Sequence, residues 1–140
     1  MIVYCAGAIK GDTSYQKYLK EIIVHLTSLD HTPLSELNEN FKSSIPLTDK
    51  EIFKRDIKWL EQSKLMIAEI SGPSLGVGFE ISYALYELKI PVLALYNSKV
   101  EKISAMITGC TSKLITIKSY YDNEDLKDIV TDFIKNQSEQ

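Results

Sequence analysis

The sequence predicts an α/β fold with a mostly parallel sheet. Short apolar runs that suit strands alternate with segments in which apolar residues recur at the helical period of 3.6. Residues 64–70 form one continuous apolar run, as expected for a central parallel strand covered on both faces. Strands that alternate with helices in this way are typical of a parallel sheet joined by helical crossovers.

Length and composition restrict the possible functions. The 140 residues predict one domain over residues 1–140, and the net charge of −3 argues against a nucleic-acid partner. No apolar run approaches the roughly 20 residues of a membrane span, and the first ten residues lack the pattern of a signal peptide. Cys5 and Cys110 lie far apart without metal-type spacing. We therefore expect a cytoplasmic protein that holds no metal.

The first half of the chain begins with a strand, a turn and a helix. The strand is expected at residues 2–6 and the turn at 7–12. The apolar face of the helix comprises Tyr15, Tyr18, Leu19, Ile22, Ile23, Leu26 and Leu29. A poor strand signal at 32–37 and a loop at 38–47 follow.

The second helix is expected to begin after Thr48, because Thr48 and Glu51 have the spacing of a capping box. Its predicted inner stripe is Phe53, Ile57 and Leu60. Asp56 lies three residues after Phe53 and therefore on the same face.

The second half continues the alternation after the strand at 64–70. The segment SGPSLGVG turns into a third helix, whose apolar positions are Val77, Ile81, Ala84, Leu85 and Leu88. Strands are predicted at 91–96 and 113–118, with a short helix at about 100–108 between them. The last helix carries a stripe of Leu126, Ile129, Val130, Phe133 and Ile134.

Ligands of such sheets bind at the carboxyl ends of the strands, so residues 5–12, 69–80 and 96–106 are the expected site segments. Glu69 ends the central strand, where it either contacts a ligand or reaches solvent. Tyr4 lies in the first strand and would normally belong to the core.

Like Asp56 on the second helix, Glu80 is an acid on the apolar face of its helix, the third, where it lies beside Val77 and Ile81. Acids are rarely buried without partners. With two such acids, two interpretations are about equally supported: a functional role, or a position at the edge of the helix face where each acid reaches solvent. Paired carboxylates can divide the roles of acid and nucleophile, typically at the anomeric carbon of a sugar.

Ser74, Gly76 and Gly78 lie between a strand and a helix, where an anion can approach the helix N-terminus. A tight turn with a serine cap is an equally good interpretation. The dinucleotide fingerprint is incomplete, because Ile81 stands at the third glycine position. Lys10, after the first strand, either meets an anion or is an exposed loop lysine.

Three stretches together resemble the 2'-deoxynucleoside 5'-phosphate N-hydrolases, which belong with the nucleoside 2-deoxyribosyltransferases. They are the pattern Tyr4-x-x-Gly7-x-Ile9-Lys10-Gly11, the block IFKRDIKWLEQSKLMIAEISGPSLGVGFEISYAL and the segment KISAMITG. The resemblance covers nearly the whole chain. It implies a flavodoxin-like (Rossmann-like) three-layer sandwich with a five-stranded sheet, a homodimer, and a retaining mechanism through a covalent glycosyl-enzyme without metal or cofactor.

The resemblance also implies roles for individual residues. Glu80 matches the nucleophile that attacks C1' of deoxyribose, Asp56 the acid that protonates the departing base, and Tyr4 the residue that positions the nucleophile. The implied substrate-binding residues are Gly7, Ile9, Lys10, Ser74, Gly76, Ser104 and Met106. Among these, Ser104 and Met106 match residues that a neighbouring subunit lends to the site.

The chain departs from the family pattern at three positions. Ala8 stands where the hydrolases have a phosphate-binding serine, and Leu37 where a histidine is expected. Lys10 replaces an arginine, which keeps the charge but loses the bidentate fork.

The leading hypothesis is hydrolysis of the N-glycosidic bond of 2'-deoxynucleoside 5'-monophosphates. A deoxyribosyltransferase that exchanges bases is the first alternative, and a non-catalytic nucleotide sensor on the same fold is the second. The base preference does not follow from the sequence, and the loop at 38–47 is the expected source of base contacts.

Overall fold

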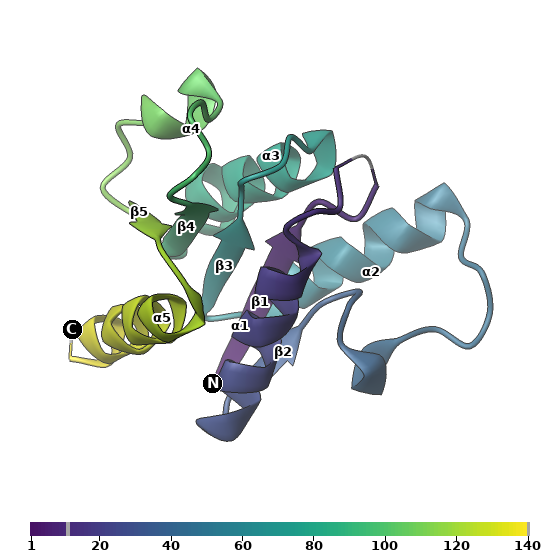
Figure 1. The fold of residues 1–140 in the computed structure, drawn as a ribbon. Helices are drawn as coiled ribbons and strands as arrows, with labels where there is room; N and C mark the ends of the chain where they lie inside the picture. The colour runs from purple at the N-terminus through teal and green to yellow at the C-terminus, as the bar shows by residue number, and fades with distance from the viewer. Residues whose placement is uncertain (11, 140) are drawn as a thin grey trace.

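The computed structural model describes residues 1–10 and 12–139, which build a five-stranded sheet (Figure 1). The strands are β1 (Ile2–Gly7), β2 (Thr32–Leu34), β3 (Leu65–Glu69), β4 (Val92–Asn97) and β5 (Ile115–Tyr120). All four neighbouring pairs are parallel, and the order is β2-β1-β3-β4-β5. This is the flavodoxin-like order. The predicted fold class is confirmed, with a sheet that is entirely parallel.

Four helices cover the two faces of the sheet (Figure 1). Helices α1 (Gln16–Ser28) and α5 (Asn123–Ser138) lie on one face, and α2 (Asp49–Gln62) and α3 (Leu75–Ser82) lie on the other. Because successive strand residues point to opposite faces, Val3 and Cys5 pack with α1 and α5. Tyr4 and Ala6 pack on the side of α2 and α3. The three-layer arrangement thus turns Tyr4 toward the two helices that carry Asp56 and Glu80.

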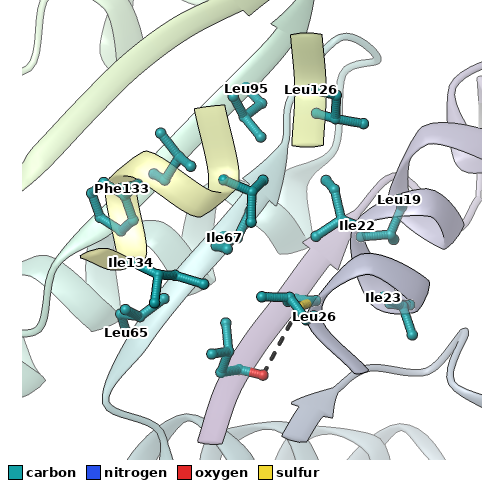
Figure 2. Packing of buried hydrophobic residues seen from close by; sticks show 14 of the residues in the cluster. Leu19, Ile22, Ile23, Leu26, Leu65, Ile67, Leu95, Leu126, Phe133 and Ile134 are labelled. Atoms are coloured by element: carbon teal, nitrogen blue, oxygen red, sulfur yellow. Dashed lines mark hydrogen bonds between the residues drawn. The ribbon is translucent and has the colours of Figure 1, made fainter. Parts of the chain in front are cut away.

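The core between the sheet, α1 and α5 follows the predicted stripes (Figure 2). Leu26 of α1 and Leu126 of α5 have no more than 1% of their surface exposed. Both helices bury most of the apolar residues that the 3.6-residue period selects; Tyr15, Tyr18 and Ile129 are partly buried, and Leu29 at the end of α1 is exposed. Asp122 caps α5 by accepting a hydrogen bond from the Asp125 amide at 2.9 Å.

Two short elements differ from the prediction. Strand β2 ends at Leu34, because the hydroxyl and carbonyl of Ser35 accept amide hydrogen bonds from Leu37 and Asn38 and turn the chain. The helix expected at 100–108 is restricted to α4 (Ala105–Thr108), since the segment after β4 first turns around Asn97. The loop at 38–47 holds one short 3₁₀ turn, η1 (Glu39–Phe41).

The start of α2 is as predicted, and its inner stripe departs from the prediction at Phe53, while Ile57 packs against the core as expected. Thr48 and Glu51 exchange the two hydrogen bonds of a capping box, at 3.2 and 2.9 Å. Leu60 is fully buried, whereas Phe53 is 54% exposed and packs edge to face on Phe79 of α3. The N-terminal end of α2 extends beyond the sheet (Figure 1), so only its C-terminal half can bury an apolar stripe against the strands.

Helix α3 does not end where its α-helical hydrogen bonds end. It continues as a π-helix, η2 (Tyr83–Leu88), and closes at Lys89, which is in the left-handed conformation. Ala84 and Leu85 remain buried as predicted. Within residues 1–10 and 12–139, no helix combines the length and apolar character that crossing a bilayer requires.

Candidate active site

The site begins with a direct hydrogen bond between β1 and α3. The hydroxyl of Tyr4 donates to Oε2 of Glu80. Tyr4 is 4% exposed, so its phenol reaches Glu80 from within the core layer beneath α2 and α3. Val77 and Ile81, one turn before Glu80 and next to it, are buried and fix this face of α3 against the sheet. The predicted association of Tyr4 with Glu80 is therefore present.

Asp56 enters the same cluster from α2 and is held by its neighbour Arg55. The Nε of Arg55 donates to Oδ1 of Asp56 at 2.9 Å, and its Nη2 donates to Oε1 of Glu36, just after β2. The Arg55 guanidinium also lies 4.7 Å from the centre of the Trp59 ring. The Arg55 and Asp56 side chains are only 19% and 17% exposed, and Glu36 is 30% exposed. The cluster therefore contains three carboxylates and one guanidinium.

Burial controls the ionisation of both candidate catalytic acids. It raises the pKa of Glu80 to about 7; the Tyr4 hydrogen bond opposes this rise, and the charges of Asp56 and Glu36 add to it. Burial also raises the pKa of Asp56, against the effect of Arg55 and with a contribution from Glu36. Burial and the two carboxylates raise the pKa of Tyr4 as well, so its hydroxyl stays protonated and donates. Such shifts typically mark functional carboxylates.

A second feature, the N-terminus of α3, lies between one and two turns before Glu80. Ser74 is the N-cap, and its Oγ accepts from the Val77 amide at 3.2 Å. The Ser74 hydroxyl hydrogen remains available for an acceptor. A side chain at Gly76 would meet only the Ser74 Oγ, at 3.9 Å, and one at Gly78 would meet nothing within 4 Å. Open space above these glycines and free amides at a helix start suit an anionic group.

The loop after β1 is only partly organised around this cluster. Gly7 and Ala8 are buried and line a small pocket with Gln16, and a side chain at Gly7 would come within 2.9 Å of Leu19. The Ile9 carbonyl accepts from Gln16 Nε2 at 3.2 Å. Lys10 is exposed. Gly11, the last residue of the pattern, lies outside the described residues. The roles of Gly7, Ile9 and Lys10 stay predictions.

Ser104 and Met106 are separate from the Tyr4–Glu80 cluster within one chain. Ser104 is the N-cap of α4 and accepts from the Met106 amide at 3.3 Å. Met106 is 84% exposed, so its side chain lies outside the core of the single chain. In the described part of the chain, neither residue hydrogen-bonds to Tyr4, Asp56 or Glu80.

Glu69 does not reach solvent, and its contact with a ligand stays a prediction. It is 3% exposed and accepts hydrogen bonds from Tyr120, from the Ser71 amide at 2.7 Å and from the Ser71 hydroxyl at 2.8 Å. The Ser71 hydroxyl also accepts from the Asn97 amide at 2.8 Å. Burial raises the pKa of Glu69, and these hydrogen bonds oppose the rise. The network ties together the ends of β3, β4 and β5.

The family of the chain follows from comparison with known sequences. The family model described as "Nucleoside 2-deoxyribosyltransferase" matches residues 3–128. The chain belongs to the nucleoside 2-deoxyribosyltransferase family. This confirms the resemblance seen in the sequence and, with it, the prediction of an enzyme that acts on N-glycosidic bonds.

Relatives within and around this family cover most of the chain. A Thermofilum pendens protein, provisionally named 2'-deoxynucleoside 5'-phosphate N-hydrolase 1, is 36% identical over 89% of each chain. A Tetraodon nigroviridis protein named 5-hydroxymethyl-dUMP N-hydrolase is 31% identical over 98% of this chain and 99% of its own. The structure of a CMP N-glycosidase from Clostridium botulinum, 18% identical, superposes with a TM-score of 0.70 over 94% of this chain and 98% of the other, which shows the same fold.

Glu36 and Arg55 are the members of the cluster that the sequence analysis missed. Glu36 follows a strand with a poor sequence signal, and Arg55 is adjacent to Asp56 in a helix rich in charged residues. An Arg-Asp pair at neighbouring positions is common on exposed helices and carries no functional signal of its own. Only the fold brings Glu36, 19 residues earlier, to the same guanidinium.

Proposed function

We propose that this chain, as one domain over residues 1–140, hydrolyses the N-glycosidic bond of 2'-deoxynucleoside 5'-monophosphates to free base and deoxyribose 5-phosphate. The observation that carries the proposal is the hydrogen bond of Tyr4 to Glu80 beside the Arg55-bound Asp56. Two partly buried carboxylates with different partners suit the division of roles between a nucleophile and an acid. The names of the Thermofilum and Tetraodon relatives support this class of substrate.

The first step is attack of the ionised Glu80 on C1' of the sugar. The bond between C1' and the base nitrogen breaks as a C1'–O bond to Glu80 forms, and Asp56 transfers its proton to the base. The transition state has oxocarbenium character, which a carboxylate beside C1' stabilises. Tyr4 holds the attacking carboxylate in position and lowers the cost of its ionisation.

The second step is hydrolysis of the glycosyl-enzyme. A water molecule attacks C1', Asp56 accepts the proton of that water, and the C1'–O bond to Glu80 breaks. Glu80 leaves as a carboxylate and Asp56 is again protonated, so the cycle closes without a metal or an organic cofactor.

The 5'-phosphate in this proposal binds at the N-terminus of α3. The free hydroxyl hydrogen of Ser74 and the open space above Gly76 support this location. Lys10 adds positive charge from the loop after β1, whereas Ala8 offers no hydroxyl. Phosphate recognition therefore rests on α3 and on one flexible cation, which binds as a point charge.

The proposal includes a homodimer in which Ser104 and Met106 complete the site of the partner subunit. Both residues are exposed in the single chain. Leu75 and Phe79 on α3 are also exposed, at 97% and 54%, and a second copy would cover such apolar side chains.

Subunit complementation tests this sharing. Glu80→Gln and Ser104→Ala chains, each impaired alone, are mixed and allowed to exchange. In the heterodimer one site carries both lesions and the other carries neither, so activity should rise above that of either parent. No recovery after demonstrated exchange would show that Ser104 does not serve the partner's site.

A transferase is the second candidate, because the matching family model is that of the 2-deoxyribosyltransferases. In that reaction a second base, rather than water, accepts the sugar from Glu80. Incubation with a panel of nucleoside monophosphates and nucleosides, with and without a second free base, separates the two by chromatography. Hydrolysis predicts free base and sugar phosphate in both conditions. Exchanged nucleoside would favour transfer, and tight binding without base release would favour the sensor.

A further inference from the structure

The Asp56 carboxyl is bound by a guanidinium, which opposes the role of an acid. Arg55 Nε donates to Asp56 Oδ1 at 2.9 Å. A guanidinium next to a carboxyl favours its ionised form, whereas the acid of the first step must carry a proton. Burial of Asp56 already opposes this effect of the guanidinium, and a second carboxylate bound to Arg55 would oppose it further.

Glu36 is the group placed to do so. It accepts from Nη2 of the same guanidinium that binds Asp56 through Nε, and Arg55 Cζ lies 4.7 Å from the centre of the Trp59 ring. With 30% of its side chain exposed, Glu36 lies at the edge of the cluster, and Arg55 is more deeply buried at 19%. The charge of Arg55 is thus shared between two carboxylates rather than concentrated on Asp56.

We propose that Glu36 is a positioning residue for the acid: by binding Arg55, it lets this guanidinium orient Asp56 while leaving Asp56 able to carry the proton that the base receives. Arg55 occupies Oδ1, so Oδ2 is the oxygen that bears the proton. The inference rests on the proposed function for its catalytic meaning, but the ionisation of Asp56 can be measured without any substrate.

The charged and titratable groups that face Asp56 come from four parts of the fold. Tyr4 comes from β1, Glu36 from the segment after β2, Arg55 from α2 itself and Glu80 from α3. Tyr4 favours the ionised forms of both Glu80 and Asp56, whereas Glu36 favours protonated Asp56. Glu36 also raises the pKa of Glu80, so its removal shifts both carboxyls in the same direction.

The test compares Glu36→Gln with wild type in two ways. Carboxyl-carbon NMR of the substrate-free protein should show the Asp56 titration moved to lower pH by about 0.5–1 unit, on the scale of charge–charge effects in proteins. In kinetics, the ratio of wild-type to Glu36→Gln kcat/KM should be about three- to tenfold higher at a pH above the Asp56 titration measured by NMR than at a pH below it. Glu36→Asp keeps the charge and should keep the wild-type pH dependence.

Two further variants separate this role from a structural one. The double variant Glu36→Gln/Arg55→Gln removes both charges and should return the Asp56 titration toward that of wild type. Glu39→Gln makes the same charge change at an exposed ion pair with Lys42 and should alter neither readout. All variants are checked for folding by thermal unfolding.

An unchanged or raised Asp56 pKa in Glu36→Gln, or a kinetic ratio that is the same at every pH, would overturn the inference and leave Glu36–Arg55 as a structural ion pair. Failure of the wild type to release base from any nucleotide would instead overturn the proposed function, while the NMR titration would still decide the role of Glu36.

Discussion

Tyr4→Phe removes one hydroxyl and no packing volume, so it isolates the hydrogen bond that carries the proposed site. The hydroxyl lowers the pKa of Glu80, which is about 7 with the bond in place. Hydrogen bonds to charged groups contribute about 1.5–3 kcal/mol, which corresponds to about 1–2 pKa units. The substitution should therefore raise the pKa of Glu80 to about 8–9.

The consequence for activity depends on pH in a defined way. If only ionised Glu80 attacks, the Tyr4→Phe loss in kcat/KM at pH 7 is about 5-fold for a rise of one unit and about 50-fold for two. At pH 6 the loss grows to about 9- to 90-fold, and at pH 9 it shrinks to about twofold or less. Raising the pH should therefore rescue the variant.

The assay is base release from a 2'-deoxynucleoside 5'-monophosphate below saturation, for both proteins across pH 6–9. Titration of the substrate phosphate affects both proteins equally and cancels in the ratio. Phenylalanine occupies the same space in β1, and circular dichroism checks the fold. A loss of equal size at every pH would refute the reasoning, because it would show that Tyr4 affects geometry rather than the ionisation of Glu80.

Three other predictions concern the acid, the phosphate end and the core. Asp56→Asn should slow substrates with poor leaving groups most, by about 10²–10⁴-fold, measured as kcat over a series of bases; equal slowing of all bases would make Asp56 a positioning residue. Ser74→Ala should reduce kcat/KM for monophosphates more than for the corresponding nucleosides. An equal reduction for both would show that the phosphate does not bind at the N-terminus of α3. Leu60→Ala, at a fully buried side chain, should cost about 2–5 kcal/mol in urea unfolding, whereas Phe53→Ala, at a half-exposed one, should cost clearly less; the reverse order would contradict the observed face of α2.

Periodicity predicted most of the fold, because the burial of helices against a sheet follows the spacing of apolar residues. The stripes of α1 and α5 and the apolar run of β3 are examples. The inner stripe of α2 was wrong at Phe53, because a helical wheel gives the angle of a residue but not how far the helix extends past the sheet. The capping box at Thr48 and the serine cap at Ser74 could also be predicted, because such contacts join residues only three positions apart in the sequence.

The site was predictable only in part, since its contacts join distant elements. Spacing alone placed Asp56 and Glu80 on apolar faces. Their association with Tyr4, 76 residues before Glu80, came from the family resemblance. No pattern pointed to Glu36 or to the burial of Glu69, whose partner Tyr120 lies 51 residues later. Long-range polar pairs of this kind leave no periodic trace.

The central claim, that Glu80 is the nucleophile, is tested most directly by trapping the glycosyl-enzyme. The protein is incubated with a 2'-fluoro-substituted deoxynucleoside 5'-monophosphate analogue, digested and analysed by mass spectrometry. The proposal predicts one sugar-phosphate adduct on the peptide that contains Glu80, and neither adduct nor turnover with Glu80→Gln. An adduct on another residue, or near-wild-type turnover by Glu80→Gln, would contradict it.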